Sequence, residues 1–265
     1  MRKSTLLVFL ILFGVVVYFV YGMITWNIFV SFTDWKGAIP SYNFVGLANY
    51  SKAFQDPLFW RSLGNTLLLF LAIPCSLGLG LFLATLLHQN VRGARVFTFI
   101  FLMPFAFSFV VSGVVWSWLA SSWCQDPSTV MLSVIIAMVW QLSGYCALVL
   151  FAGMRSVPRE EIDAAKSKGA STFRAYREVV FPRLKVPILA SVVVLMVFTL
   201  KAAFDLVWTM TEGGPGTSSY NLPILVVNEA YSKVHVAYGA AVGTILVAIV
   251  LCIIIPYVYL SYRRR

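Results

Sequence analysis

Residues 163–182 read DAAKSKGASTFRAYREVVFP, a charged and glycine-interrupted stretch that lies between two long apolar runs, 130–151 and 186–208. In the whole chain 60% of the residues are hydrophobic and 11% are charged, whereas about a quarter of the residues of a typical soluble domain are charged. We therefore expect a membrane protein, in which a polar stretch of this kind leaves the bilayer or contacts another molecule.

Six apolar runs are long enough to cross the hydrocarbon core of a bilayer, which takes about 20 helical residues. The runs do not alternate between apolar and polar residues, so they predict helices rather than the strands of a barrel. Pro74, Pro104 and Pro256 lie inside them, where kinks are tolerated. The sequence predicts an all-α membrane protein with six transmembrane helices in a single domain over residues 1–265. The predicted spans are 5–24, 66–87, 96–119, 130–151, 186–208 and 238–260.

The distribution of Lys and Arg between the loops predicts the orientation of the chain. Fifteen of these residues fall on the side that carries both termini and the segment 157–185, and four fall on the other side. Cytoplasmic loops of membrane proteins are enriched in Lys and Arg. We therefore expect the N terminus, the C terminus and the segment 157–185 to be cytoplasmic.

Segment 157–185 has the pattern of an amphipathic helix interrupted at Gly169, which permits either a turn between two short helices or a close backbone contact. Pro158 suits the first turn of a helix, and acidic residues follow it. Gly169 disfavours a continuous helix and permits a turn. Apolar residues recur at steps of three and four, which predicts one apolar stripe. The stripe comprises Ile162, Ala165, Gly169, Phe173, Tyr176 and Val180.

Three surfaces are candidates to receive this apolar stripe. It can lie on anionic lipid headgroups, pack against the cytoplasmic ends of the protein's own helices, or insert into a groove of a separate cytoplasmic protein. Physical chemistry alone leaves these three alternatives open.

The same stretch resembles the cytoplasmic EAA motif of binding-protein-dependent ATP-binding-cassette importer permeases: E-A-A, three residues, Gly, nine residues, then I-x-L-P. Residues 163–165, Gly169 and residues 179–182 keep that spacing, although Asp163 stands in place of glutamate and Lys168 in place of aspartate. Other segments resemble the sugar and glycerol-phosphate branch of these permeases, in the same order along the chain. They include RGARVFTFIFLMP at 92–104, FAGMRSVPREE at 151–161 and FDLVWTMTEGGPGTSS at 204–219.

The resemblance implies a type I importer permease fold and a multi-pass protein of a bacterial or archaeal plasma or inner membrane. Its function would be the import of a sugar or a related polyol phosphate by alternating access. The implied partners are a second homologous permease subunit, two cytoplasmic ATP-binding subunits and an external substrate-binding protein. Segment 157–185 is then the coupling-helix loop that contacts the ATP-binding subunits. The residues implied at that contact are Asp163, Ala164, Ala165, Lys168, Gly169, Ala170, Phe173 and Pro182.

The sequence contains no G-x-x-x-x-G-K-[ST] loop with which to hold ATP phosphates. Gly213 to Thr217 is glycine-rich but lacks the lysine, and it predicts a turn. We therefore expect that the chain is not an enzyme and binds no cofactor or metal of its own. ATP and Mg would be used by the partner ATPase subunits.

Two charged residues inside the fifth predicted span are candidates for a substrate path. Lys201 and Asp205 are four residues apart on one helix face, and a charge at the bilayer centre costs about 2.5–3.5 kcal/mol unless it is paired or hydrated. They either neutralise each other or line a hydrated path. Trp208 either anchors the helix at the interface or stacks on a sugar ring. Asn228 and Tyr231, before the last span, are further candidates.

Other classes of function fit the sequence less well. The net charge of +10 does not indicate nucleic-acid binding, because the basic residues lack a neighbouring platform of aromatic side chains. A membrane enzyme is disfavoured because His88 and His235 fall near opposite faces of the membrane, away from any nucleophile or metal constellation. The alternative is a secondary transporter driven by an ion gradient, since six spans and a buried ion pair also suit that class.

Overall fold

The computed structural model describes residues 3–89 and 93–263, which form helices and connecting loops. Within these ranges the only β contact is an isolated bridge between Thr33 and Phe44. The predicted all-α architecture is confirmed. The chain separates into two compact units. The single domain expected over residues 1–265 stays a prediction.

The first unit joins the described residues up to Arg61 with Leu222–Ile253. Asn27 links its two long helices, because its Nδ2 donates to the carbonyl oxygen of Ala240 at 3.2 Å and to Thr244 Oγ1 at 3.0 Å. The elements of this unit are α1 (Lys3–Ser31), α2 (Ala48–Gln55), α12 (Leu222–Val227), a π-helical turn (Asn228–Ser232) and most of α13 (Val236–Arg263).

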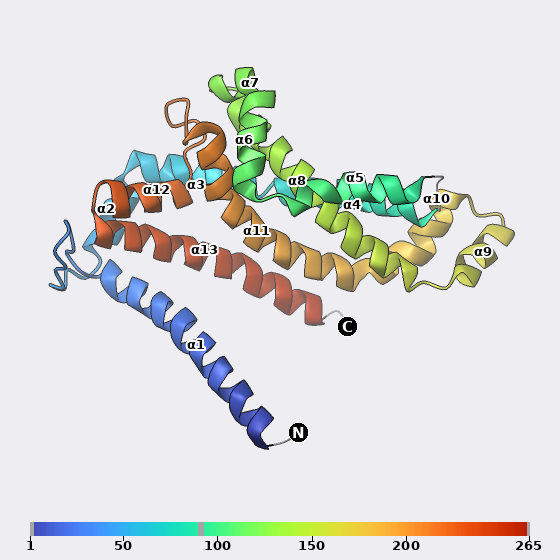
Figure 1. The fold of residues 1–265 in the computed structure, drawn as a ribbon, viewed down its shortest axis with the longest axis horizontal. Coiled ribbons are helices and arrows are strands. Elements are labelled where there is room, and N and C mark those ends of the chain that lie inside the picture. Colours follow the sequence, from blue (N-terminus) through green and yellow to red (C-terminus); the bar gives the residue numbers. More distant parts are fainter. Residues whose placement is uncertain (1–2, 90–92, 264–265) are drawn as a thin grey trace. The chain divides into compact units, whose positions relative to one another are not determined.

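The second unit joins Ser62–Asn221 with the described residues from Ile254 onward. Its central helix is α8 (Val130–Arg155), which packs against α4, α5 and α11 (Figure 1). The remaining helices are α3 (Pro57–Leu69), which begins in the first unit, α4 (Ala72–His88), α5 (Ala94–Ala106), α6 (Phe109–Leu119), α7 (Ser121–Gln125), α9 (Arg159–Ser167), α10 (Thr172–Ala175) and α11 (Lys185–Thr211). A π-helical turn (Tyr176–Val180) and a 3₁₀ turn (Phe181–Leu184) lead from α10 into α11.

Small residues bring α4 close to α8. A Cβ atom added at Gly80 of α4 would lie 2.3 Å from Cys146 Cβ of α8, a distance that real contacts do not reach. On α8, Met138, Leu142 and Cys146 are completely buried. The two helices therefore pack tightly along their length, as interiors of proteins generally do.

The helices agree with five of the six predicted spans. Within the described residues, five helical stretches are long and apolar enough to cross a membrane, or six if one bent pair counts as a single span. The five stretches are Phe9–Ser31, Pro57–His88, Val130–Arg155, Thr172–Thr211 and Val236–Tyr259.

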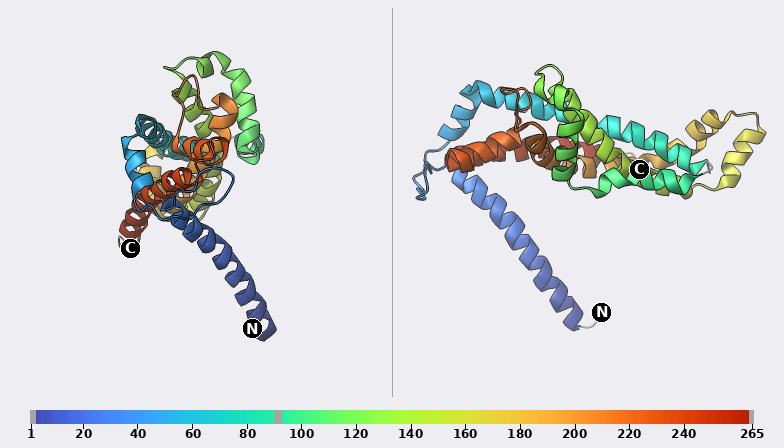
Figure 2. Two further views of the ribbon diagram at one scale, coloured as in Figure 1. Left: turned by 90° about the vertical axis from the view of Figure 1, so that its left-hand side faces the viewer. Right: turned by 45° about the horizontal axis from the view of Figure 1, so that its top comes forward.

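The third predicted span, 96–119, is wrong as a single helix. It consists of α5 and α6, which meet at an angle of 103° (Figures 1 and 2). Pro104 cannot donate a backbone hydrogen bond, and Phe107 is extended. Ser108 then starts a new helix, because its Oγ accepts a hydrogen bond from the backbone N–H of Val111 at 3.2 Å. The expected kink is therefore a complete break.

The other two prolines behave differently. Phe70 and Leu71 form a turn between α3 and α4, just before Pro74, whose missing N–H cannot bond to Phe70. Pro256 lies inside α13 without ending it. The cytoplasmic placement of both termini stays a prediction. Arg2, Arg92, Arg264 and Arg265, which contribute to the charge count, lie outside the described residues.

Candidate functional site

The motif segment forms a hairpin of two short helices, α9 and α10, at one end of α8 (Figure 2). Pro158 precedes the first helical residue, and Ser171 Oγ caps α10 by accepting from the N–H of Arg174 at 3.3 Å. Gly169 adopts a φ of +87°, in the left-handed region that glycine tolerates and other residues rarely adopt. The predicted turn between two short helices at Gly169 is confirmed.

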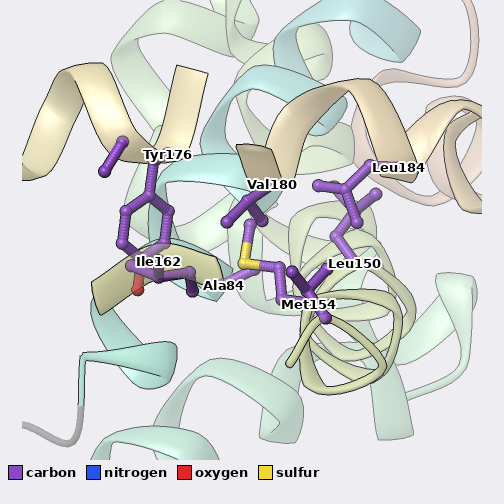
Figure 3. Packing of buried hydrophobic residues seen from close by; sticks show 9 residues of the cluster. Ala84, Leu150, Met154, Ile162, Tyr176, Val180 and Leu184 are labelled. Carbon is purple, nitrogen blue, oxygen red and sulfur yellow. The ribbon is translucent and has the colours of Figure 1, made fainter. Parts of the chain in front are cut away.

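Most of the apolar stripe packs on the protein itself. Ile162, Tyr176 and Val180 are buried, together with Ala84 of α4 and Met154 of α8 (Figure 3). The second of the three alternatives, packing against the ends of the protein's own helices, therefore describes these residues. Gly169 and Phe173 are the exceptions, because both are exposed, Phe173 to 70%.

The residues implied at the coupling contact lie mostly on the outer face of the hairpin. Ala165 and Ala170 are half-buried, and the others are exposed. The exposed ones are Asp163, Ala164, Lys168, Gly169, Phe173 and Pro182. The hairpin thus combines a buried inner face, which fixes its position, with an exposed outer face that carries both charges and an aromatic ring.

A second feature is a cavity of about 190 Å³ where α5 breaks from α6. Lys201 and Asp205 of α11 both line it, which is one of the two alternatives that the sequence left open. No ion pair joins these two described residues, so the geometry favours lining over mutual neutralisation. The other lining residues are Phe105, Phe107, Ser108, Phe109, Gln141 and Phe198.

Gln141 of α8 is a cavity residue that the sequence analysis missed. Only 2% of it is exposed, and its Nε2 donates to the carbonyl oxygen of Phe107 at 2.8 Å. Its Oε1 is buried and has no hydrogen-bond partner. A buried polar atom without a partner is costly, which makes Gln141 an unusual residue inside an apolar span. The signal in the sequence was a lone amide inside an apolar span.

Four phenylalanines line the cavity, and two of them pack with further aromatic rings, among them Tyr145 outside the lining. The ring centroids of Phe105 and Phe198 lie 5.7 Å apart, and those of Phe105 and Tyr145 lie 5.3 Å apart. A lining of this kind offers flat apolar faces beside the polar groups of Gln141 and Lys201. Such a combination suits a ligand that has both apolar faces and hydroxyl groups.

The remaining candidates do not join this cavity. Trp208 stacks on Phe204 with 5.9 Å between the ring centroids and is not among the residues that line it. Asn228 and Tyr231 belong to the first unit, and Tyr231 is exposed. The structure therefore brings together only Lys201 and Asp205 of the five residues predicted for a substrate path.

A wider hollow of about 510 Å³ lies at the other end of α11 from the hairpin. It is lined by Ser117, Ser121, Cys124, Gln125, Thr209, Met210, Thr211, Glu212, Gly214 and Pro215. The glycine-rich segment on its rim forms the predicted turn. Asn65 holds the following residues in place, because its Nδ2 lies 3.1 Å from the carbonyl oxygen of Ser218 and 2.8 Å from that of Tyr220.

Comparison with known proteins identifies the family. Residues 76–265 match the family described as "Binding-protein-dependent transport system inner membrane component". The chain is 46% identical to a probable ABC transporter permease protein of Pyrococcus horikoshii, with 99% of each chain covered. It is 34% identical to the xylose/arabinose import permease protein XacH of Haloferax volcanii, over 92% of this chain and 84% of that protein.

A solved structure has the same fold. The bacterial ABC transporter involved in the import of the acidic polysaccharide alginate contains a chain that superposes with a TM-score of 0.82 at 17% identity, covering 99% of this chain and 96% of that one. The type I importer permease architecture expected from the sequence is thereby confirmed. The secondary transporter receives no support from these comparisons. The chain belongs to the inner-membrane permease components of binding-protein-dependent ABC importers.

Proposed function

We propose that this chain is the permease subunit of an ATP-driven importer of a sugar, which it passes through the cavity lined by Gln141, Lys201 and Asp205. Two curated relatives support the sugar class: the xylose/arabinose import permease and the trehalose/maltose transport system permease protein MalF of Thermococcus litoralis, which is 28% identical over 86% of this chain and 83% of that protein. The observation that carries the proposal is the cavity itself, in which Lys201, Asp205 and Gln141 lie among four phenylalanines.

The chemistry of the cavity matches a sugar in two respects. Sugar rings present apolar C–H faces, which stack on aromatic side chains such as Phe105 and Phe198. Sugar hydroxyls both donate and accept hydrogen bonds, so they can contact the polar lining residues Gln141, Lys201 and Asp205. The phosphate of a related polyol phosphate could pair with the Lys201 ammonium group. Competition of unlabelled sugar or polyol phosphate with labelled sugar uptake distinguishes the two ligand classes.

The proposed assembly contains four kinds of protein. Besides this chain it has a second homologous permease, two ATP-binding subunits that use ATP and Mg, and an external substrate-binding protein. The family description supports the binding protein. A second structure of the alginate transporter, in complex with an alginate pentasaccharide-bound periplasmic protein, supports the same arrangement for this fold at a TM-score of 0.81.

The exposed face of the α9–α10 hairpin is the proposed contact with the ATP-binding subunits. Asp163, Lys168 and Phe173 would enter a groove there, while Gly169 would allow a close approach of the two backbones. Closure of the ATP-binding subunits would displace the hairpin and tilt α8 and α11, so that the cavity opens alternately to either side. In this arrangement the chain would lie in the plasma or inner membrane, and the hairpin would be on the cytoplasmic side.

Reconstitution tests this function directly. The chain is co-purified with its partner subunits and placed in proteoliposomes with the binding protein and radiolabelled xylose, arabinose, trehalose or maltose. Uptake of at least one of these sugars is expected to require ATP and to persist when ionophores collapse the ion gradients. Uptake that continues without ATP and stops with ionophores would establish the secondary transporter instead.

A further inference from the structure

Tyr176 is a polar residue buried inside the apolar cluster that fixes the hairpin. It follows α10 directly, and only 4% of it is exposed. Its ring lies in the same cluster as Ile162 of α9 and Ala84 of α4 (Figure 3). A buried hydroxyl must find a hydrogen-bond partner or carry the cost of desolvation.

The partner of that hydroxyl comes from a different transmembrane stretch. Tyr176 Oη lies 2.7 Å from Nδ1 of His88, the last residue of α4. The tautomer of the imidazole decides which of the two atoms donates. The rings meet edge to face, with 5.7 Å between their centroids. The contact is therefore both a hydrogen bond and an aromatic pair, between residues that are distant in sequence.

This contact links the hairpin segment to α4, a helix that is not adjacent to the segment in the sequence. α8 leads into α9, and the 3₁₀ turn leads into α11. A movement of the hairpin can therefore reach α8 and α11 through the backbone. α4 is separated from the hairpin by α5, α6, α7 and α8 in the sequence. Leu81, Ala84 and His88, on successive turns of α4, are its links to this cluster.

We infer that the His88–Tyr176 pair is a clasp through which movement of the hairpin is transmitted to α4 during transport; this inference rests on the proposed coupling function. The packing of Leu81 and Ala84 is non-directional, so these side chains can slide against the cluster with little loss. The hydrogen bond is directional and holds one relative position. With the clasp intact, α4, α8 and α11 move together, and the tight approach of Gly80 to Cys146 keeps α4 aligned with α8.

The test measures the number of sugar molecules transported per ATP hydrolysed in the complete reconstituted assembly. Tyr176→Phe keeps the buried ring and removes only the hydroxyl. We expect it to lower this ratio by about threefold to tenfold, the range that corresponds to the loss of one net hydrogen bond. His88→Leu should lower the ratio to a similar extent, and His88→Gln, which retains hydrogen-bonding groups, should restore part of it.

Two further measurements separate the clasp from a purely structural contact. Because both residues act through one bond, the double variant Tyr176→Phe/His88→Leu should lower the ratio no further than either single variant. Tyr50→Phe is the matched control: it removes a hydroxyl that lies 2.6 Å from Ser31 Oγ in the first unit, and it should leave the ratio unchanged.

The outcomes distinguish the clasp from the proposed function. A Tyr176→Phe assembly with the wild-type ratio, in an assay where the wild type shows ATP-dependent uptake, would overturn the clasp alone. Losses that multiply in the double variant would also overturn it. ATP-independent uptake by the wild-type assembly would overturn the proposed function and the clasp together.

Discussion

Gln141 Nε2 donates to the main-chain oxygen of Phe107 at 2.8 Å, and this bond fixes α8 to the break between α5 and α6. The carbonyl of Phe107 is available because the break interrupts the helical hydrogen-bond pattern there. The same residue lines the cavity, while its Oε1 is buried and has no hydrogen-bond partner. One side chain thus satisfies the broken backbone and forms part of the cavity lining.

Gln141→Leu should impair sugar binding more than ATP hydrolysis. The change removes the acceptor and leaves the Phe107 carbonyl without its partner, so we expect the sugar KM for uptake to rise about tenfold. Uptake kinetics and ATPase activity are measured on the same proteoliposomes. Ser143→Ala, on the same helix, removes a hydroxyl that bonds only to Trp140 O at 3.2 Å and serves as the control. An unchanged KM in Gln141→Leu would show that the sugar does not use this acceptor.

The break at this position marks the limit of what the sequence could predict. Apolar runs of sufficient length predicted the spans, because length and hydropathy act locally. The run 96–119 is apolar throughout, and Pro104 predicted only a kink. The 103° angle depends on Ser108 capping a new helix and on Gln141 bonding to Phe107 across the unit. The Gln141–Phe107 bond is a tertiary contact, and such contacts leave no periodic signal in the sequence.

In the motif segment, too, the local features were predictable from the sequence and the tertiary contacts were not. Gly169 predicted its turn because a φ of +87° is a local requirement. The stripe of apolar residues was predicted too, but the surface that covers it was not. Ile162, Tyr176 and Val180 pack against α4 and α8, which a periodic pattern cannot distinguish from packing against a partner. The exposed residues of the segment, Phe173 among them, are the part that the protein's own helices leave uncovered.

Lys201 and Asp205 should contribute to transport independently. Both line the cavity, and no ion pair joins these described side chains. We expect Lys201→Met and Asp205→Asn each to reduce sugar uptake roughly tenfold, with losses that multiply in the double variant. Initial rates of uptake at saturating ATP provide the measurement. A double variant that transports better than either single one would instead indicate that the two charges neutralise each other.

Gly169 allows the backbone requirement of the hairpin to be separated from its contact with a partner. A Cβ at this position meets no atom within 4 Å, so only the positive φ opposes a side chain in the permease itself. Gly169→Asn tolerates that φ and should leave the melting temperature almost unchanged. Gly169→Val should destabilise the fold by about 1–3 kcal/mol.

Both Gly169 variants should nevertheless lose ATP-driven uptake, since each places a side chain where the proposed partner approaches. Thermal unfolding in detergent and uptake in proteoliposomes are compared for the two. Lys166→Ala, an exposed position of α9 outside the implied contact, is the control for both assays. Full uptake by Gly169→Asn would mean that the ATP-binding subunits do not cover this turn.

Glu229 of the first unit should make folding stability depend on pH. Burial raises the pKa of this carboxyl, but hydrogen bonds from Lys233 at 2.6 Å and His235 at 2.9 Å, together with their charges, outweigh burial and hold the pKa below its usual value of 4.5. The folded state therefore binds fewer protons at Glu229 than the unfolded state does. The resulting stabilisation is complete above the usual pKa and is lost as the pH falls through the lower folded value.

Glu229→Gln removes that contribution. Its melting temperature should lie several degrees below that of the wild type near neutral pH. The neutral amide lacks the charge that strengthens the hydrogen bonds from Lys233 and His235. The difference should shrink as the pH falls below 4.5 and through the lower pKa of the folded state, where the wild-type carboxyl takes up a proton. Thermal unfolding is followed between about pH 3 and pH 7 in detergent, with the exposed Glu160→Gln as the control. A difference that stays constant across this range would show that Glu229 stabilises the fold by packing and not by its charge.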